Sequence, residues 1–284
     1  MRNEIVNLYE CFHMTAPAGA EGFLEGWFTQ TAAAIAVGRR RPAVLILPGG
    51  GYSRTSDREA EPVALRYLAA GYVPFVLRYS CAPHLFPTAL REAAMAMKYI
   101  RLHAHEWEID PAMVAAVGFS AGGHLCGMLG TMYDAPEVSD IAPACEIRPD
   151  VLGLCYPVAV SWGRTHENSF RNLTSGDTQL CKRLSLDALA RPDMPPVFLW
   201  HTREDGAVPC RNSLVLATAM EEAGVCFVLH IYNHGPHGLS LANEMAYPAG
   251  CVPAVSRDVP GWLDAQLEFF REQGFYIQDE GWNK

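Results

Sequence analysis

The sequence predicts an α/β fold in which helices cover both faces of a mostly parallel central sheet. Short apolar runs of strand length alternate along the chain with segments of helical periodicity, which is typical of parallel strands joined by helices. The first strong run, residues 43–47 (AVLIL), contains no polar residue, so we expect a strand that is buried on both faces. A chain of 284 residues is long enough for one large domain of this kind. We therefore expect a single domain over residues 1–284.

The predicted elements follow one another in a regular order. The run at 43–47 ends in a proline and three glycines, and the capping-box pattern of Ser56 and Glu59 predicts that a helix begins at Ser56 and reaches Ala70. Further strands are expected at 72–79, 113–118, 150–156, 196–201 and 225–232, and further helices at 87–105, after Ser120, at 211–223 and at 262–271. Sheets of this kind bind ligands at the carboxyl ends of their strands.

One segment interrupts this alternation. Residues 158–195 show little periodicity, and we interpret them as a short lid-like insertion over the strand ends. Two aromatic residues of this segment, Trp162 and Phe170, are expected to contact substrate together with Tyr52. His166 has two possible roles, in substrate contact or as a surface histidine of a loop.

Composition excludes several classes of protein. The formal net charge is −9, which disfavours nucleic acid and anionic membranes as partners. The nine cysteines form no C-x-x-C pair, and an odd number of them indicates a reducing compartment rather than a disulfide framework. The first thirty residues lack the pattern of a secretory signal, and no apolar run approaches the length of a membrane span. We therefore expect a cytoplasmic protein that acts on a small molecule; the oligomeric state is left open.

A nucleophile is predicted at Ser120. Residues 118–122 read G-x-S-x-G, directly after the apolar run 113–117 and before helical sequence. This motif places a serine on a sharp turn between strand and helix, where glycines relieve crowding and the start of the helix faces developing negative charge. The alternative interpretation is a glycine-rich turn whose serine only caps the helix.

A serine hydroxyl is a weak nucleophile and needs a base that a third group orients. With this motif, the acid and then the histidine follow the serine along the chain. Asp205, just after the strand at 197–200, is the expected acid, and Glu204 is its local alternative. Two earlier acids, Asp187 and Asp193, are weaker candidates because they precede that strand.

The expected base is His237, in a loop of small and rigid residues after the strand at 225–232. His234 is the alternative base. The two histidines would also suit a metal, but no third ligand accompanies them at a convincing spacing, so we expect no metal and no cofactor.

Pro48-Gly49-Gly50-Gly51 follows the first buried strand and is the expected oxyanion loop. Acyl transfer generates a negatively charged oxygen that must meet donors already in position. Glycines let the backbone approach a substrate closely and present its N–H groups. The N–H groups of Gly50, Gly51 and Ala121 are the expected donors; a simple glycine turn is the alternative.

These motifs resemble the acetyl xylan esterase and feruloyl-esterase-like branch of the α/β-hydrolases. The resemblance spans residues 42–241 and is carried by the segments PGGGY (48–52), SDREAEPVA (56–64), GFSAGGHL (118–125) and THENSFRNL (165–173). It implies that Ser120, Asp205 and His237 form a catalytic triad and that the substrate is a short-chain ester, such as an O-acetyl group on a xylo-oligosaccharide. An amide hydrolase with the same triad, peptidase or arylformamidase-like, is the first alternative. A non-catalytic binding protein on the same scaffold is the second.

Overall fold

The computed structural model describes residues 2–29 and 38–279, and these form one nine-stranded sheet. Its strand order is β1-β2-β4-β3-β5-β6-β7-β8, and β9 pairs with the start of β3. The strands are β1 (Arg2–Asn7), β2 (Phe23–Phe28), β3 (Arg39–Leu47), β4 (Val73–Arg78), β5 (Ile109–Phe119), β6 (Val151–Cys155), β7 (Val197–Thr202), β8 (Phe227–Tyr232) and β9 (Gln278–Asp279).

The predicted fold class is confirmed. The strands from β4 through β3, β5, β6 and β7 to β8 pair in parallel, whereas β1, β2 and β9 pair antiparallel with their neighbours. Neither β1 nor β2 was predicted from the sequence. In β1 no side chain is fully buried, because it is an edge strand, and its polar sequence RNEIVN lacks the apolar run by which the inner strands are found.

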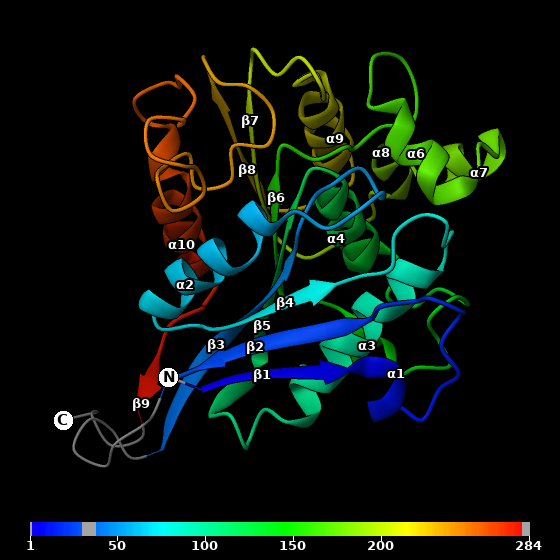
Figure 1. The fold of residues 1–284 in the computed structure, drawn as a ribbon, viewed down its shortest axis with the longest axis vertical. Coiled ribbons are helices and arrows are strands. Elements are labelled where there is room, and N and C mark those ends of the chain that lie inside the picture. Colours follow the sequence, from blue (N-terminus) through cyan, green and yellow to red (C-terminus); the bar gives the residue numbers. More distant parts are fainter. Residues whose placement is uncertain (1, 30–37, 280–284) are drawn as a thin grey trace.

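Helices cover both faces of the sheet (Figure 1). Successive residues of β3 point to opposite faces, so that Leu45 and Leu47 pack on one side and Val44 and Ile46 on the other. The first side is covered chiefly by α3 (Thr88–Leu102), α4 (Ala121–Thr131) and α9 (Arg211–Glu222), and the second by α2 (Glu61–Ala69) and α10 (Trp262–Glu272).

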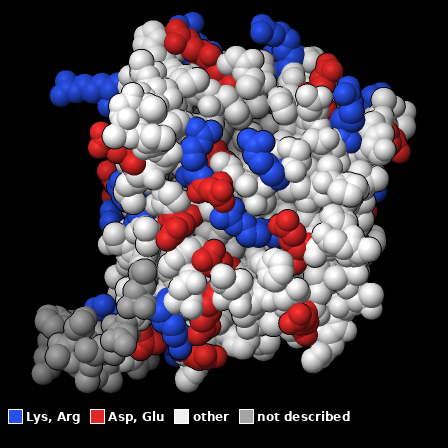
Figure 2. Space-filling view, in the orientation of Figure 1, with Lys and Arg blue, Asp and Glu red and all other residues white. Residues whose placement is uncertain are grey.

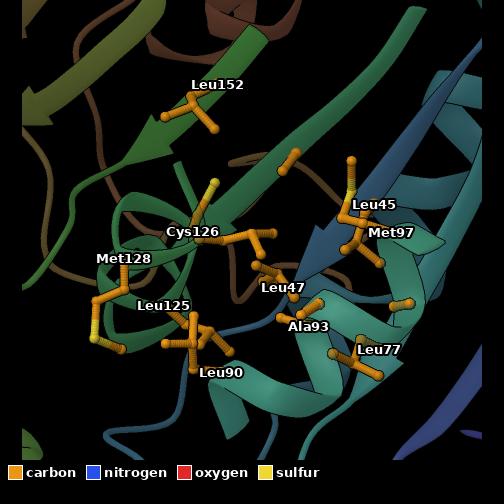
Figure 3. Packing of buried hydrophobic residues seen from close by; sticks show 14 of the residues in the cluster. Leu45, Leu47, Leu77, Leu90, Ala93, Met97, Leu125, Cys126, Met128 and Leu152 are labelled. Carbon is orange, nitrogen blue, oxygen red and sulfur yellow. The ribbon is translucent and has the colours of Figure 1, made fainter. Parts of the chain in front are cut away.

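The core beneath α3 and α4 fixes the position of the predicted nucleophile. Figure 3 shows Leu45 and Leu47 of β3 facing Met97 of α3 and Leu125 of α4, and all four side chains are completely buried. Each such side chain contributes about 1.5–3 kcal/mol when it leaves water. Because α4 begins at Ala121, this packing also anchors the turn that holds Ser120.

The predicted helix from Ser56 begins later than expected. A short turn of 3-10 helix (Asp57–Glu59) comes first, Ser56 makes no side-chain cap, and α2 starts at Glu61 with Pro62 in its first turn. The capping-box prediction was wrong because the Glu59 carboxylate turns into the protein interior, where it accepts a hydrogen bond from the backbone N–H of Gly49.

The segment 158–195 lies between β6 and β7 and holds three short helices. They are α6 (Glu167–Thr174), α7 (Thr178–Arg183) and α8 (Leu186–Leu189). Leu186 of α8 packs into the core beside α4, so this part of the segment belongs to the main body of the fold. Short helices also follow β1 and precede β6, as α1 (Leu8–Cys11) and α5 (Ala144–Ile147).

The described surface carries charges of both signs. Figure 2 shows Lys and Arg side chains interspersed with Asp and Glu over the face that it draws. Within residues 2–29 and 38–279, no helix has the length and apolar character needed to cross a membrane.

Candidate active site

Ser120 lies on the turn between β5 and α4, with φ 55° and ψ −116°. A non-glycine residue rarely adopts a positive φ, and such strain is typical of functional sites. The glycines two residues away make the turn possible: a Cβ added to Gly118 would lie 2.1 Å from the carbonyl oxygen of Gly122, and one added to Gly122 would lie 2.0 Å from that of Leu47. The G-x-S-x-G pattern therefore has a steric cause.

The fold brings Ser120, His237 and Asp205 together. Oγ of Ser120 lies 2.7 Å from Nε2 of His237, and Nδ1 of that imidazole lies 2.6 Å from Oδ2 of Asp205. Asp205 follows β7 and His237 follows β8, so neighbouring parallel strands deliver both residues to the same edge of the sheet as Ser120. With Asp205 ionised, Nδ1 carries the proton, and Nε2 is left to accept the hydrogen bond of the serine hydroxyl.

Asp205 is held as a carboxylate. Its side chain is fully buried, and Oδ1 accepts hydrogen bonds from the backbone N–H groups of Ala207 and Val208 at 3.0 and 2.8 Å. Burial by itself raises the pKa of Asp205, but hydrogen bonds from His201 and His237 outweigh it and hold that pKa well below its ordinary value. A permanent negative charge therefore faces Nδ1 of His237.

The alternative acid and base lie together at the surface. His234 Nδ1 lies 3.0 Å from Glu204 Oε1, and about half of each side chain is exposed. His234 is also within 2.7 Å of the side chain of Asn233. The described residues contain no group of three or more His, Cys, Asp and Glu side chains suited to hold a metal ion.

The loop after β3, which contains two of the expected oxyanion donors, lies beside Ser120: a Cβ added to Gly49 would be 2.9 Å from Cβ of Ser120. Gly50 and Gly51 have φ angles of 131° and 65°, in the region where glycine is favoured. The loop is fixed at both ends: Tyr79 donates a hydrogen bond to the carbonyl of Pro48 at 2.6 Å, and Asn172 donates one to that of Gly51 at 2.8 Å. Its backbone is thus held in one conformation.

Glu59 connects this loop to the segment that carries His237. Oε2 of Glu59 accepts from the N–H of Gly49 at 2.8 Å, and Oε1 accepts from the hydroxyl of Tyr156 at 2.7 Å. The same hydroxyl accepts a hydrogen bond from the backbone N–H of Ser240 at 2.8 Å. No role of Glu59 at the site was predicted from the sequence, because only the tertiary structure places its carboxylate against Gly49.

A cavity of about 470 Å³ opens over Ser120. One wall comes from the loop after β3 and the turn before α2, the other from α6 and its preceding loop, and His237 and Gly238 complete the lining. The lining is mainly polar and contains no aliphatic or phenyl side chain: Gly50, Gly51, Ser53, Arg54, Ser56, Arg58, Glu59, Ser120, His166, Asn168, Asn172, His237 and Gly238.

His166 is the one predicted substrate contact that lines this cavity. Its Nδ1 lies 2.8 Å from Oγ of Ser169. Burial and the neighbouring His237 lower the pKa of His166, so the imidazole is neutral at pH 7. Asn168 and Asn172 line the same wall and were not singled out from the sequence, although both stand in the segment 165–173 that carried the resemblance.

The three predicted aromatic contacts lie elsewhere in the described structure. Tyr52 is buried beneath the loop, where its hydroxyl lies 2.8 Å from Nδ1 of His124, and Phe170 packs against the His124 ring. Trp162 is 45% exposed; its indole N–H donates to Asp187, and its ring lies under Arg211. In α6 it is Asn168 and Asn172 that line the cavity, whereas Phe170 points into the protein. Spacing along the chain does not reveal which side of this helix faces the cavity.

Two family models match the chain. Residues 35–147 match the model described as BD-FAE, and residues 96–249, more than half of the chain, match the prolyl oligopeptidase family. Together the two matches include the loop after β3, Ser120, Asp205 and His237.

Several known proteins are similar to the chain over most of its length. The acetylxylan esterase of Xylanibacter ruminicola is 30% identical over 78% of this chain and 45% of that protein. The solved acetyl ester-xyloside bifunctional hydrolase of Caldicellulosiruptor lactoaceticus is 32% identical, with a TM-score of 0.82 and coverage of 96% of this chain and 97% of the other. MGS-M1, an α/β-hydrolase enzyme from a deep-sea metagenome library of the Medee basin, is 31% identical over 96% of this chain and 98% of its own, with a TM-score of 0.74.

The chain spans 33% to 52% of the length of the curated relatives it matches first. The two solved structures, in contrast, each match 96% of this chain, which covers 97% and 98% of their own length. The parallel sheet and the serine on the turn after β5 agree with these similarities, and the resemblance inferred from the motifs is confirmed. The chain belongs to the esterases of the α/β-hydrolase superfamily.

Proposed function

We propose that the protein is a serine carboxylesterase that removes short acyl groups, chiefly acetyl, from hydroxyls of xylo-oligosaccharides or related sugars. The observation that carries this proposal is the polar cavity of about 470 Å³ over the Ser120, His237 and Asp205 side chains. A long acyl chain requires an apolar wall, which this lining lacks, whereas sugar hydroxyls match the amide, imidazole and guanidinium groups that are present.

In the proposed mechanism Ser120 Oγ attacks the ester carbonyl carbon while His237 Nε2 takes the hydroxyl proton. Asp205 orients the imidazole and stabilises its cation. The tetrahedral intermediate collapses, and the sugar hydroxyl leaves with the proton that His237 returns. Water then attacks the acetyl-serine with His237 again acting as base, and acetate leaves while Ser120 is restored.

The N–H groups of Gly50, Gly51 and Ala121 are the proposed oxyanion donors. Ala121 is the first residue of α4, where the unpaired N–H groups and the helix dipole favour negative charge. Gly50 and Gly51 belong to the loop held by Asn172 and, through Gly49, by Glu59. Fixed donors need no reorganisation as charge develops, and the loss of one such donor typically lowers kcat about 10²–10³-fold.

The names of the relatives support the acyl group and the alcohol that we propose. One similar protein is an acetylxylan esterase, and the solved structure that the chain covers almost completely is an acetyl ester-xyloside hydrolase.

The test is hydrolysis of p-nitrophenyl esters from acetate to octanoate, followed by acetylated xylo-oligosaccharides. We expect kcat/KM to be greatest for acetate and to fall at least about tenfold by octanoate, because the cavity lacks an apolar wall. Ser120→Ala should lower kcat by about 10⁴-fold or more while the thermal unfolding temperature stays near that of the wild type. A maximum at octanoate, or full activity of the variant, would refute the proposal.

An amide hydrolase on the same triad is a second candidate, favoured by the match of residues 96–249 to the prolyl oligopeptidase family. An amide is the harder substrate because its leaving nitrogen must be protonated. Comparison of p-nitrophenyl acetate with an aminoacyl p-nitroanilide separates the two functions. A greater kcat/KM for the anilide would replace the ester by a peptide or amide substrate.

A further inference from the structure

Two arginines line the cavity without an acidic partner. Within residues 2–29 and 38–279, neither Arg54 nor Arg58 forms an ion pair with a carboxylate, although the chain holds 31 acidic and 22 basic residues. The nearest acids along the chain are engaged elsewhere: Asp57 pairs with Arg78 at 3.0 Å, and Glu59 accepts from Gly49 and Tyr156. Both arginines therefore line the cavity without an ion pair to a described carboxylate.

The side chain of Arg58 is held in position beside the reacting groups. Its guanidinium carbon lies 4.8 Å from the centre of the Tyr247 ring, a cation–π contact. The Tyr247 hydroxyl donates to the carbonyl of Gly238 at 2.9 Å, so the ring is itself fixed. A Cβ added to Gly238 would lie 3.7 Å from Nη2 of Arg58, which places the guanidinium next to the residue that follows His237.

We propose that Arg54 and Arg58 form a subsite for an anionic group, a carboxylate or a phosphate, on the sugar that bears the ester. This inference rests on the proposed function and narrows its substrate class to acylated acidic sugars. The planar guanidinium donates two parallel hydrogen bonds to such an anion, and a side chain already held in place loses little freedom on binding. The lining contains one carboxylate, Glu59, whose two oxygens accept hydrogen bonds from Gly49 and Tyr156. The wall with His166, Asn168 and Asn172 adds no negative charge.

The test measures binding without turnover, by isothermal titration of the protein with sugars that carry no ester. Xylotriose is compared with the same trisaccharide bearing a glucuronic acid substituent, and glucose with glucose 6-phosphate. We expect the charged member of at least one pair to bind about tenfold more tightly, an advantage that shrinks between 50 and 500 mM NaCl. Tighter binding of only the glucuronic acid derivative identifies the anion as a carboxylate. Tighter binding of only glucose 6-phosphate identifies it as a phosphate.

Two variants assign the effect. Arg58→Gln should abolish most of the advantage of the charged sugar, and Arg54→Gln should reduce it, whereas Arg257→Gln, an exposed arginine outside the cavity lining, should retain it. Equal binding within both pairs, absence of binding by all four sugars, or an advantage that survives in both cavity variants would overturn the subsite. Because no ester is cleaved, this result is independent of esterase activity, and inactivity on acetyl esters would refute the proposed function alone.

Discussion

His124 illustrates how burial decides the chemistry of a single residue in this protein. Its ring lies wholly inside the protein, one turn into α4, with Nε2 2.7 Å from the carbonyl of Leu184 and Nδ1 2.8 Å from the hydroxyl of Tyr52. Nε2 therefore donates, and Nδ1 accepts the tyrosine hydrogen bond. The histidine is a structural link between α4, the loop after β3 and residue 184, and it lies behind the cavity.

Burial lowers the pKa of His124 from 6.5 to about 4, which predicts sensitivity to acid. Between these values the unfolded chain binds a proton that the folded protein does not, so stability is complete above pH 6.5 and falls as the pH drops to about 4. The shift corresponds to about 3 kcal/mol. We expect urea unfolding of the wild type to show this loss between pH 7 and pH 4.5.

The matched variant for this measurement is His124→Gln, which lacks the titrating group. Its free energy of unfolding should be lower than that of the wild type at pH 7, because one of two buried hydrogen bonds is lost. It should vary less with pH over the same interval. If the free energy of unfolding varied with pH in the same way for both proteins, the loss of stability in acid would not come from His124.

The turn between β5 and α4 depends on close approach of two backbone segments. A Cβ on Gly122 would lie 2.0 Å from the carbonyl oxygen of Leu47 and 2.4 Å from that of Pro48. Gly122→Ala should therefore lower the free energy of unfolding by about 3 kcal/mol, because backbone atoms must move. Gly261→Ala is the control, since nothing lies within 4 Å of its added Cβ. Equal midpoints of denaturant unfolding for the two variants would show that the turn adapts.

The conformation of the loop after β3 also depends on a hydrogen bond to Glu59. In Glu59→Gln one carboxylate oxygen becomes an NH₂ group, which cannot accept a hydrogen bond, so either Gly49 or Tyr156 loses its acceptor. We expect kcat for p-nitrophenyl acetate to fall about 10–100-fold with KM little changed, because displaced oxyanion donors weaken transition-state binding. The exposed Glu61→Gln is the control, and a change in KM alone would point to ground-state binding instead.

At the scale of the molecule, the fold places only one of two adjacent acids, Asp205 and Glu204, against His237. Asp205 is buried against His237, whereas Glu204 lies at the surface beside His234. Asp205→Asn should lower kcat by about 10⁴-fold, because the imidazole loses the partner that fixes its tautomer. Glu204→Gln should leave kcat within about twofold. Comparable losses in both variants, measured with p-nitrophenyl acetate, would contradict the proposed triad.

The cavity is also a property of the whole molecule. Its walls come from residues 50–59, from the α6 region at 166–172 and from 237–238, which only the assembled sheet and its covering layer bring together. From the sequence, His166 was a candidate substrate contact with a surface role as its alternative, whereas Arg54, Arg58, Asn168 and Asn172 were not predicted at the site. Polar residues in loops have no periodicity that marks which of them face a common space.

The sequence by itself determined the mostly parallel sheet, the positions of its inner strands along the chain and the turn that carries Ser120. These features depend on local properties: apolar runs that must be buried, and glycines where a Cβ would collide with backbone. The tertiary structure alone decided that Glu59 binds the loop after β3 instead of capping a helix, that Tyr52 and Phe170 are covered, and that the edge strand β1 joins the sheet. Each of these depends on contacts between segments distant in sequence, whose energies no local pattern records.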